Sequence, residues 1–141
     1  MDGAVEVVLI EDNPDDVALT LRGLRRAGLV NHIEVLRDGV EALEFLLGHD
    51  ASTAHPMVVL LDLSLPMVEG LQVLERLRAD PRTRTLPVVI LTSSRQEYDR
   101  IASERLGIHS YIIKPVDFPK LAATVQQLGL YWLLLSQPPA R

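Results

Sequence analysis

The chain has 141 residues, about the length of one ordinary domain, and its 14 Lys and Arg against 19 Asp and Glu give a net charge of −5. Its 48% hydrophobic content excludes general disorder, and its acidity argues against nucleic acid as a partner, because phosphate binding depends on clustered Lys and Arg. The absence of cysteine excludes disulfide scaffolds, thiol nucleophiles and zinc–cysteine sites.

Signals for secretion or membrane insertion are missing from the sequence. The N-terminal residues have neither the positive start nor the apolar stretch of a signal peptide. No apolar run approaches the roughly 18 residues that a membrane span requires. We therefore expect a cytoplasmic protein that does not contact a membrane.

Five short apolar runs, rich in valine, isoleucine and leucine, are typical of strands buried on both faces of a parallel sheet. They occupy residues 4–10, 33–36, 57–63, 87–92 and 111–113. After each run, apolar residues recur at the spacing of one helix face, over residues 13–28, 40–48, 71–80, 94–107 and 117–132. This alternation predicts βαβ units, and hence an α/β domain whose five-stranded parallel sheet has helices on both faces.

Several helix starts carry local signals. Asn13 is a good N-cap, and Asp15 and Asp16 then lie in the first turn, where the helix dipole favours negative charge. Farther along the chain, Ser94 and Glu97 have the S-x-x-E spacing of a capping box. These signals place the polar residues that follow the first and fourth strands at helix starts.

Reactive side chains follow four of the five predicted strands. Glu11 and Asp12 come after the first strand, Asp62 ends the third, Thr92 ends the fourth and Lys114 follows the fifth. Because ligands of α/β sheets bind outside the carboxyl ends of the strands, we expect these side chains to converge. Three carboxylates so close raise one another's pKa, and a divalent cation relieves their repulsion. Oxygen ligands of this kind fit Mg²⁺.

This set of residues resembles the receiver domain of two-component response regulators, in order and in spacing, over about residues 5–128. Gly70 and the aromatic Tyr111 support the match. The resemblance implies a flavodoxin-like (βα)5 receiver fold with strand order 2-1-3-4-5. It also assigns residues 1–128 to the receiver domain and residues 129–141 to a C-terminal extension of the last helix and a tail.

The resemblance implies a chemical role for each residue of the set. Asp62 is the phosphoacceptor, and it coordinates Mg²⁺ together with Asp12 and the backbone carbonyl of Ser64. Glu11 acts on the metal directly or through a water. Lys114 pairs with Asp62 beforehand and later holds a phosphoryl oxygen, and its peptide bond to the following proline is expected to be cis.

Two further pairs of residues are implied to control the response. Thr92 and Tyr111 are the switch: the Thr92 hydroxyl turns to the phosphoryl group, and Tyr111 rotates into the space vacated. Ser64 and Ser94 flank the phosphate and are expected to tune the lifetime of the phosphorylated state.

The C-terminal run over residues 128–135 is apolar all round, where one stripe facing the sheet would suffice. Four residues remain after the sheet is covered: Leu130, Tyr131, Leu133 and Leu134. Because a monomer seldom exposes such a patch, we expect a homodimer through the fourth helix, the fifth strand, the fifth helix and this extension. The alternative is a tail that folds back on its own domain. This tail, together with the motifs at residues 12–16, 36–39 and 114–117, also resembles the single-domain regulators paired with bacterial phytochrome-type histidine kinases.

We interpret the sequence as a stand-alone response regulator that accepts a phosphoryl group on Asp62 from a histidine kinase and signals by a surface change that alters protein–protein interaction. It is then no enzyme beyond catalysing its own Mg²⁺-dependent phosphorylation and dephosphorylation. One alternative is a small Mg²⁺-dependent phosphohydrolase with Asp62 as nucleophile, although no second Asp stands two residues on as general acid. The other is a phospho-independent interaction module.

Overall fold

The computed structural model describes residues 7–26, 33–48, 56, 58–65, 68–102, 104–108 and 110–127. Its strands are β1 (Val7–Ile10), β2 (Ile33–Leu36), β3 (Val58–Asp62), β4 (Val88–Thr92) and β5 (Ser110–Ile113). Its helices are α1 (Pro14–Arg26), α2 (Gly39–Leu47), α3 (Gly70–Ala79), α4 (Arg95–Ala102) and α5 (Phe118–Gln127). Strand and helix alternate along the chain, as the sequence predicts.

The five strands form one parallel sheet in the order β2-β1-β3-β4-β5. The predicted strand order is therefore confirmed. The order reverses between β1 and β3, because the chain first moves to one edge and then crosses back to the other. Ligands of open α/β sheets bind at such a reversal, outside the carboxyl ends of the strands.

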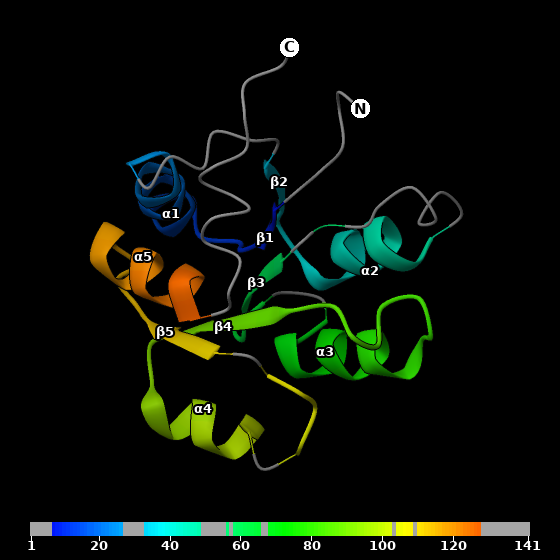
Figure 1. The fold of residues 1–141 in the computed structure, drawn as a ribbon. Coiled ribbons are helices and arrows are strands. Elements are labelled where there is room, and N and C mark those ends of the chain that lie inside the picture. The colour runs from blue at the N-terminus through cyan, green and yellow to red at the C-terminus, as the bar shows by residue number, and fades with distance from the viewer. Residues whose placement is uncertain are drawn as a thin grey trace.

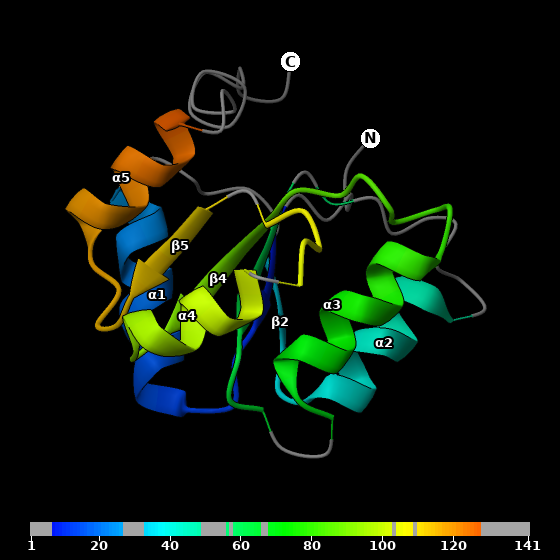
Figure 2. The same ribbon diagram turned by 90° about the horizontal axis from the view of Figure 1, so that it is seen from below.

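Helices cover both faces of the sheet, with α1 and α5 on one face and α2, α3 and α4 on the other (Figures 1 and 2). The alternation of side chains along each strand explains the two layers. In β1, for example, Val8 and Ile10 belong to the core beneath α2, α3 and α4, whereas Val7 and Leu9 belong to the core beneath α1 and α5. All four are buried, which matches an uninterrupted apolar run.

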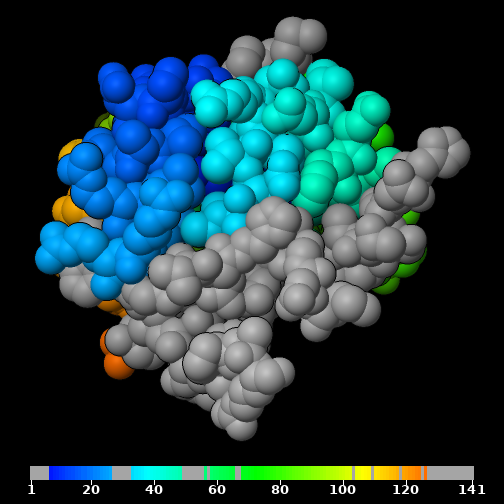
Figure 3. Space-filling view, turned by 90° about the horizontal axis from the view of Figure 1, so that it is seen from above, coloured from blue at the N-terminus to red at the C-terminus, as the bar shows by residue number. Residues whose placement is uncertain are grey.

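The β2 edge of the sheet is less buried than its centre, since Ile33, Glu34 and Val35 are only half-buried. Figure 3 shows the surface on this side, where the side chains of α1, in blue, lie beside those of the β2–α2 region, in cyan. None of the helices in the described part of the chain is long and apolar enough to cross a membrane.

Helix α4 is shorter than predicted. The apolar spacing indicated a helix as far as residue 107, but α4 ends at Ala102. The backbone then turns, with Arg105 at φ 57° and Gly107 at φ 71°, a region that right-handed helices do not use. Leu106 still packs against the core, which is why the spacing looked helical. The predicted residues 4–6, 27–28, 57, 103 and 128–132 lie outside the described residues.

Candidate functional site

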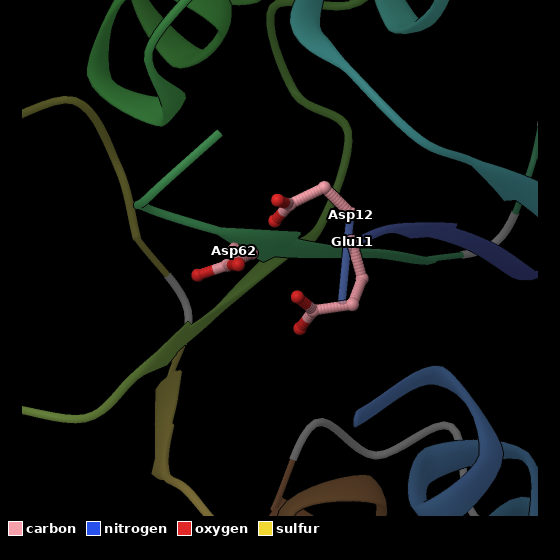
Figure 4. A group of neighbouring side chains, drawn as sticks. All are labelled: Glu11, Asp12 and Asp62. Carbon is pink, nitrogen blue, oxygen red and sulfur yellow. The ribbon is translucent and has the colours of Figure 1, made fainter. Parts of the chain in front are cut away.

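The site lies where the sheet order reverses, at the carboxyl ends of β1 and β3. Glu11 and Asp12 directly follow β1, and Asp62 is the last residue of β3. Each of the three offers one carboxylate oxygen, and these oxygens lie within 4.8 Å of one another. Figure 4 shows the three carboxylates gathered beside the strand ends. The convergence predicted from strand positions is therefore confirmed for these residues.

The three carboxylates differ in burial. Glu11 is fully buried and Asp62 is 3% exposed, whereas Asp12 is exposed. Two buried carboxylates side by side are costly unless a cation or hydrogen bonds compensate them. The backbone N–H of Asn13 donates to Glu11 Oε2 at 3.2 Å, and that of Ser64 donates to Asp62 Oδ1 at 3.1 Å.

The ammonium of Lys114 compensates part of this charge. Lys114 Nζ lies 2.8 Å from Glu11 Oε1, 3.0 Å from Asp16 Oδ2 and 3.1 Å from Asp62 Oδ2. The predicted pairing of Lys114 with Asp62 is confirmed, and the Lys114–Pro115 peptide bond is cis, as expected. Asp16 belongs to the cluster as well. From the sequence, Asp16 was expected only to interact with the dipole of α1.

Lys114 contacts three carboxylates, and Asp12 adds a fourth to the cluster. Burial and these contacts together shift the pKa values of Glu11 and Lys114. Burial, and then the neighbouring Asp62 carboxyl, raise the pKa of Glu11 to about 7, against the attraction of Lys114. Burial lowers the pKa of Lys114, but its contacts with Glu11 and Asp16 outweigh burial, so the pKa lies above its ordinary value. Neighbouring charges alone were expected to raise the carboxyl pKa, whereas burial is the larger cause for Glu11.

This donor set fits a divalent cation. Three carboxylate oxygens within 4.8 Å can ligate one ion, and the buried Glu11 and Asp62 carry more negative charge than Lys114 balances. Hard oxygen donors favour Mg²⁺ or Mn²⁺ over softer metals. Ser64 stands two residues after the end of β3 and is exposed. The contribution of its backbone carbonyl to metal binding stays a prediction.

The loop after Asp62 depends on a glycine. The backbone N–H of Gly70 donates to the carbonyl of Leu63 at 3.1 Å, which fixes the start of α3 against the end of β3. A Cβ at residue 70 would lie 2.5 Å from the Asp62 carbonyl oxygen and 2.7 Å from Leu63 Cα. Glycine is thus required for this close approach, and the approach holds the backbone that carries Asp62.

Thr92, the last residue of β4, is buried and joined to the first turn of α4. Its Oγ1 accepts from the Ser94 backbone N–H at 3.1 Å. Its own hydroxyl lies within donating distance of Glu97 Oε1 at 2.9 Å and of the Ser94 carbonyl at 3.2 Å. Glu97 N–H donates to Ser94 Oγ at 3.2 Å, which is half of the predicted capping box. The Glu97 carboxylate meets Thr92, where a full box would have it accept from Ser94.

Tyr111, in β5, is half-buried and packs against the same helix. Its ring stacks on that of Tyr98, with centroids 4.1 Å apart and planes at 25°. The guanidinium of Arg95 lies 5.6 Å from the centroid of the Tyr111 ring. Thr92 and Tyr111, the predicted switch residues, therefore both contact the first two turns of α4.

Sequence reasoning found the carboxylates, Thr92 and Lys114 from their places at strand ends. It missed Asp16 as a partner of Lys114 and Glu97 as a partner of Thr92, because a favourable place in the first turn of a helix already accounted for each. The predicted dimer-contact residues lie outside the described residues: Leu130, Tyr131, Leu133 and Leu134.

The chain is similar to known proteins in its sequence and in its fold. Residues 7–126 match the family model described as "Response regulator receiver domain". Among curated proteins, the chain is 39% identical over 134 residues to "Probable methanogenesis regulatory protein FilR2" of Methanothrix harundinacea, covering 94% of this chain and 86% of that protein. It is 34% identical to "Response regulator Rcp1" of Synechocystis, covering 95% of this chain and 92% of Rcp1.

Solved structures agree with this match. The bacteriophytochrome response regulator RtBRR has a TM-score of 0.86 and 41% identity, covering 96% of this chain and 84% of its own. The Mn²⁺-bound form of Rcp1 has a TM-score of 0.70 and 31% identity, and the match covers 96% of this chain and 99% of Rcp1. The phosphorylated cyanobacterial phytochrome response regulator RcpA has a TM-score of 0.71 and 30% identity, and the match covers 97% of this chain and 98% of RcpA.

Proposed function

Because the chain belongs to the response regulator receiver domain family, we propose that Asp62 accepts its phosphoryl group. The observation that supports this most is the environment of Asp62, a carboxylate 3% exposed at the strand end with Lys114 Nζ at 3.1 Å and two other carboxylates within 4.8 Å. A carboxylate so placed can attack phosphorus and form an acyl phosphate. Catalysis then consists of positioning and charge neutralisation.

The proposed donor is a phosphohistidine of a histidine kinase. An Asp62 carboxylate oxygen attacks the phosphorus atom in line with the leaving imidazole, so that an O–P bond forms as the P–N bond breaks. The imidazole leaves with the electron pair of that bond and takes a proton from solvent. Hydrolysis reverses the state of the regulator, because water then attacks the phosphorus and releases inorganic phosphate and the Asp62 carboxylate.

The residues around Asp62 each have a part in this step. A Mg²⁺ ion held by Glu11, Asp12 and Asp62 would neutralise charge on the phosphoryl oxygens. Lys114 stays next to Asp62 and neutralises a phosphoryl oxygen as charge builds up there. The Thr92 hydroxyl donates to another phosphoryl oxygen after transfer, and Ser64 and Ser94 tune access of the hydrolytic water.

The kinase we propose is of the bacterial phytochrome type, and the site of action is the cytoplasm. The similarity to RtBRR along 96% of the chain supports the first point. We further propose that the protein acts without nucleic acid, by assembling as a homodimer through α4, β5 and α5 and the segment that contains Leu130, Tyr131, Leu133 and Leu134. The stacked Tyr98 and Tyr111 between α4 and β5 give this face an aromatic centre that responds to the switch.

A phosphate-retarding gel tests the proposal. Wild-type protein, Asp62→Asn and the control Asp99→Asn are incubated with acetyl phosphate and either Mg²⁺ or a chelator. Asp99 lies on α4 with a side chain 63% exposed, so this control removes a carboxylate away from the cluster. We expect a retarded band for wild type and Asp99→Asn in Mg²⁺ only. A retarded band for Asp62→Asn would contradict the proposal, and equal partner binding by wild type and Asp62→Asn would favour a phospho-independent module.

A further inference from the structure

Glu97 contacts the switch residue of the site but belongs to none of the roles assigned so far. Glu97 Oε1 lies 2.9 Å from Thr92 Oγ1. Glu97 stands five positions after the end of β4, in the first turn of α4. Hydrogen bonds with an ionised acceptor are about twice as strong as neutral ones. The structure therefore shows the Thr92 hydroxyl held by a carboxylate of a helix that does not carry the phosphoacceptor.

A threonine hydroxyl has one proton, so its acceptors compete. In this structure the acceptors within reach are Glu97 Oε1 at 2.9 Å and the Ser94 carbonyl at 3.2 Å. To donate to a phosphoryl oxygen on Asp62, the Thr92 hydroxyl must rotate away from both Glu97 Oε1 and the Ser94 carbonyl. The contact with Glu97 is shorter and charge-assisted, which makes it the main competitor of the phosphoryl group.

We infer that Glu97 is a positioning residue that holds Thr92 in its resting orientation and so sets how strongly a phosphoryl group must bind to turn the switch. This inference rests on the proposed role of Asp62 and Thr92. It adds an opposing residue on α4, whose loss favours the phosphorylated conformation. Glu97 acts only through Thr92 and does not touch the reacting atoms.

The neighbouring residue extends the same argument to the second switch position. Tyr98 follows Glu97 and stacks on Tyr111 with ring centroids 4.1 Å apart. One helical turn therefore contacts Thr92 through a carboxylate and Tyr111 through a ring. Movement of Thr92 away from Glu97 loosens the turn against which Tyr111 packs, which couples the two switch residues through α4.

The experiment is a titration with beryllium fluoride and Mg²⁺, a stable mimic of the phosphoryl group, followed by the backbone amide signal of Ser94 in NMR spectra. That amide donates to Thr92 Oγ1, so it reports directly when Thr92 turns. We compare wild type, Glu97→Ala and the matched control Asp99→Ala, which removes an exposed carboxylate of the same helix. Thr92→Val and the double variant complete a double-mutant cycle.

We expect Glu97→Ala to reach its midpoint at a concentration of mimic about tenfold lower than wild type. Asp99→Ala should leave the midpoint unchanged, and in the Thr92→Val background, followed by the Gly70 amide signal, Glu97→Ala should have no further effect. The cycle separates the contact from simple charge, because loss of a negative charge near the phosphoryl site acts in both backgrounds.

An unchanged or higher midpoint for Glu97→Ala, or an equal shift in both backgrounds, would overturn the inference while leaving the phosphoacceptor proposal intact. A wild-type protein whose spectrum does not respond to the mimic at any Mg²⁺ concentration would overturn the proposed function, and the role of Glu97 with it.

Discussion

Replacing Asp62 with asparagine should stabilise the metal-free protein. Asp62 lies in a cluster where Glu11 and Asp12 carry like charge and Lys114 is the nearby cation. Asparagine keeps an oxygen to accept from the Ser64 N–H and removes the negative charge, while Lys114 keeps its contacts with Glu11 and Asp16. The substitution therefore removes repulsion at little cost in hydrogen bonds.

The distances give the magnitude. The magnitude applies at a pH well above 7, where Glu11 is ionised and where unfolding is to be measured. With an effective dielectric constant of about 20, two like charges 4.8 Å apart then repel by about 3.5 kcal/mol, so Glu11 and Asp12 together repel Asp62 by about 7 kcal/mol. The attraction of Lys114 at 3.1 Å is about 5 kcal/mol on the same scale. We expect the free energy of unfolding to rise by the difference, about 2 kcal/mol, and Tm by roughly 5–10 °C.

Thermal and urea unfolding in a chelator measure this effect, and the same experiment in Mg²⁺ supplies the second half. Metal binding stabilises the folded state by mass action, and its site in the variant lacks one carboxylate. Mg²⁺ should therefore raise the Tm of wild type clearly and that of Asp62→Asn much less. Asp99→Asn is the control for a general effect of losing a carboxylate.

The reasoning would be refuted by an Asp62→Asn variant that folds normally but unfolds at lower temperature than wild type in chelator. That result would mean that the Lys114 contact outweighs the repulsion of the two carboxylates. An equal response of both proteins to Mg²⁺ would show that Asp62 is no metal ligand.

Three further predictions concern the same fold. Gly70→Ala should cost about 2 kcal/mol of stability and weaken Mg²⁺ binding, because the added Cβ meets the Asp62 carbonyl; unchanged urea unfolding would contradict this. Arg78→Met should cost about 2–4 kcal/mol, because the guanidinium donates to four backbone carbonyls in the loops around α3 and α4; a loss within 0.5 kcal/mol, about that of a neutral surface change, would show that water replaces these bonds. Burial and then Asp62 raise the pKa of Glu11 from 4.5 to about 7. Between pH 4.5 and pH 7, Glu11 is therefore protonated in the folded chain and ionised in the unfolded chain. The stability of the metal-free protein should therefore fall as pH rises from about 4.5 to 7, and Glu11→Gln should show a flatter profile.

Most of the fold could be predicted because the pattern of apolar residues determines it. Each strand is buried on both faces, so it forms a continuous apolar run, and each helix shows its buried face as a stripe. The length of α4 could not be predicted in this way. Leu106 continues the stripe and does reach the core, but the backbone conformation of Arg105 and Gly107 ends the helix, and apolar spacing carries no information about it.

The site was predictable where strand position alone brings residues together, as with Glu11, Asp12 and Asp62. It was not predictable where a side chain has two possible partners. Asp16 is 98 positions from Lys114 in the sequence, and its place in the first turn of α1 already had an explanation. Arg78 likewise joins α3 to the carbonyl of Leu106, 28 residues away, through contacts that no local motif announces.

The most direct test of the account is the location of the phosphoryl group. Protein phosphorylated in Mg²⁺ is treated with borohydride, which reduces an acyl phosphate to a stable alcohol, and its peptides are mapped by mass spectrometry. The account predicts reduction at Asp62 and at no other carboxylate, no reduction when Mg²⁺ is left out, and no reduction in the Asp62→Asn variant. Reduction at Glu11, at Asp12 or at any residue outside the cluster would contradict the account, and so would a reduced residue in Asp62→Asn.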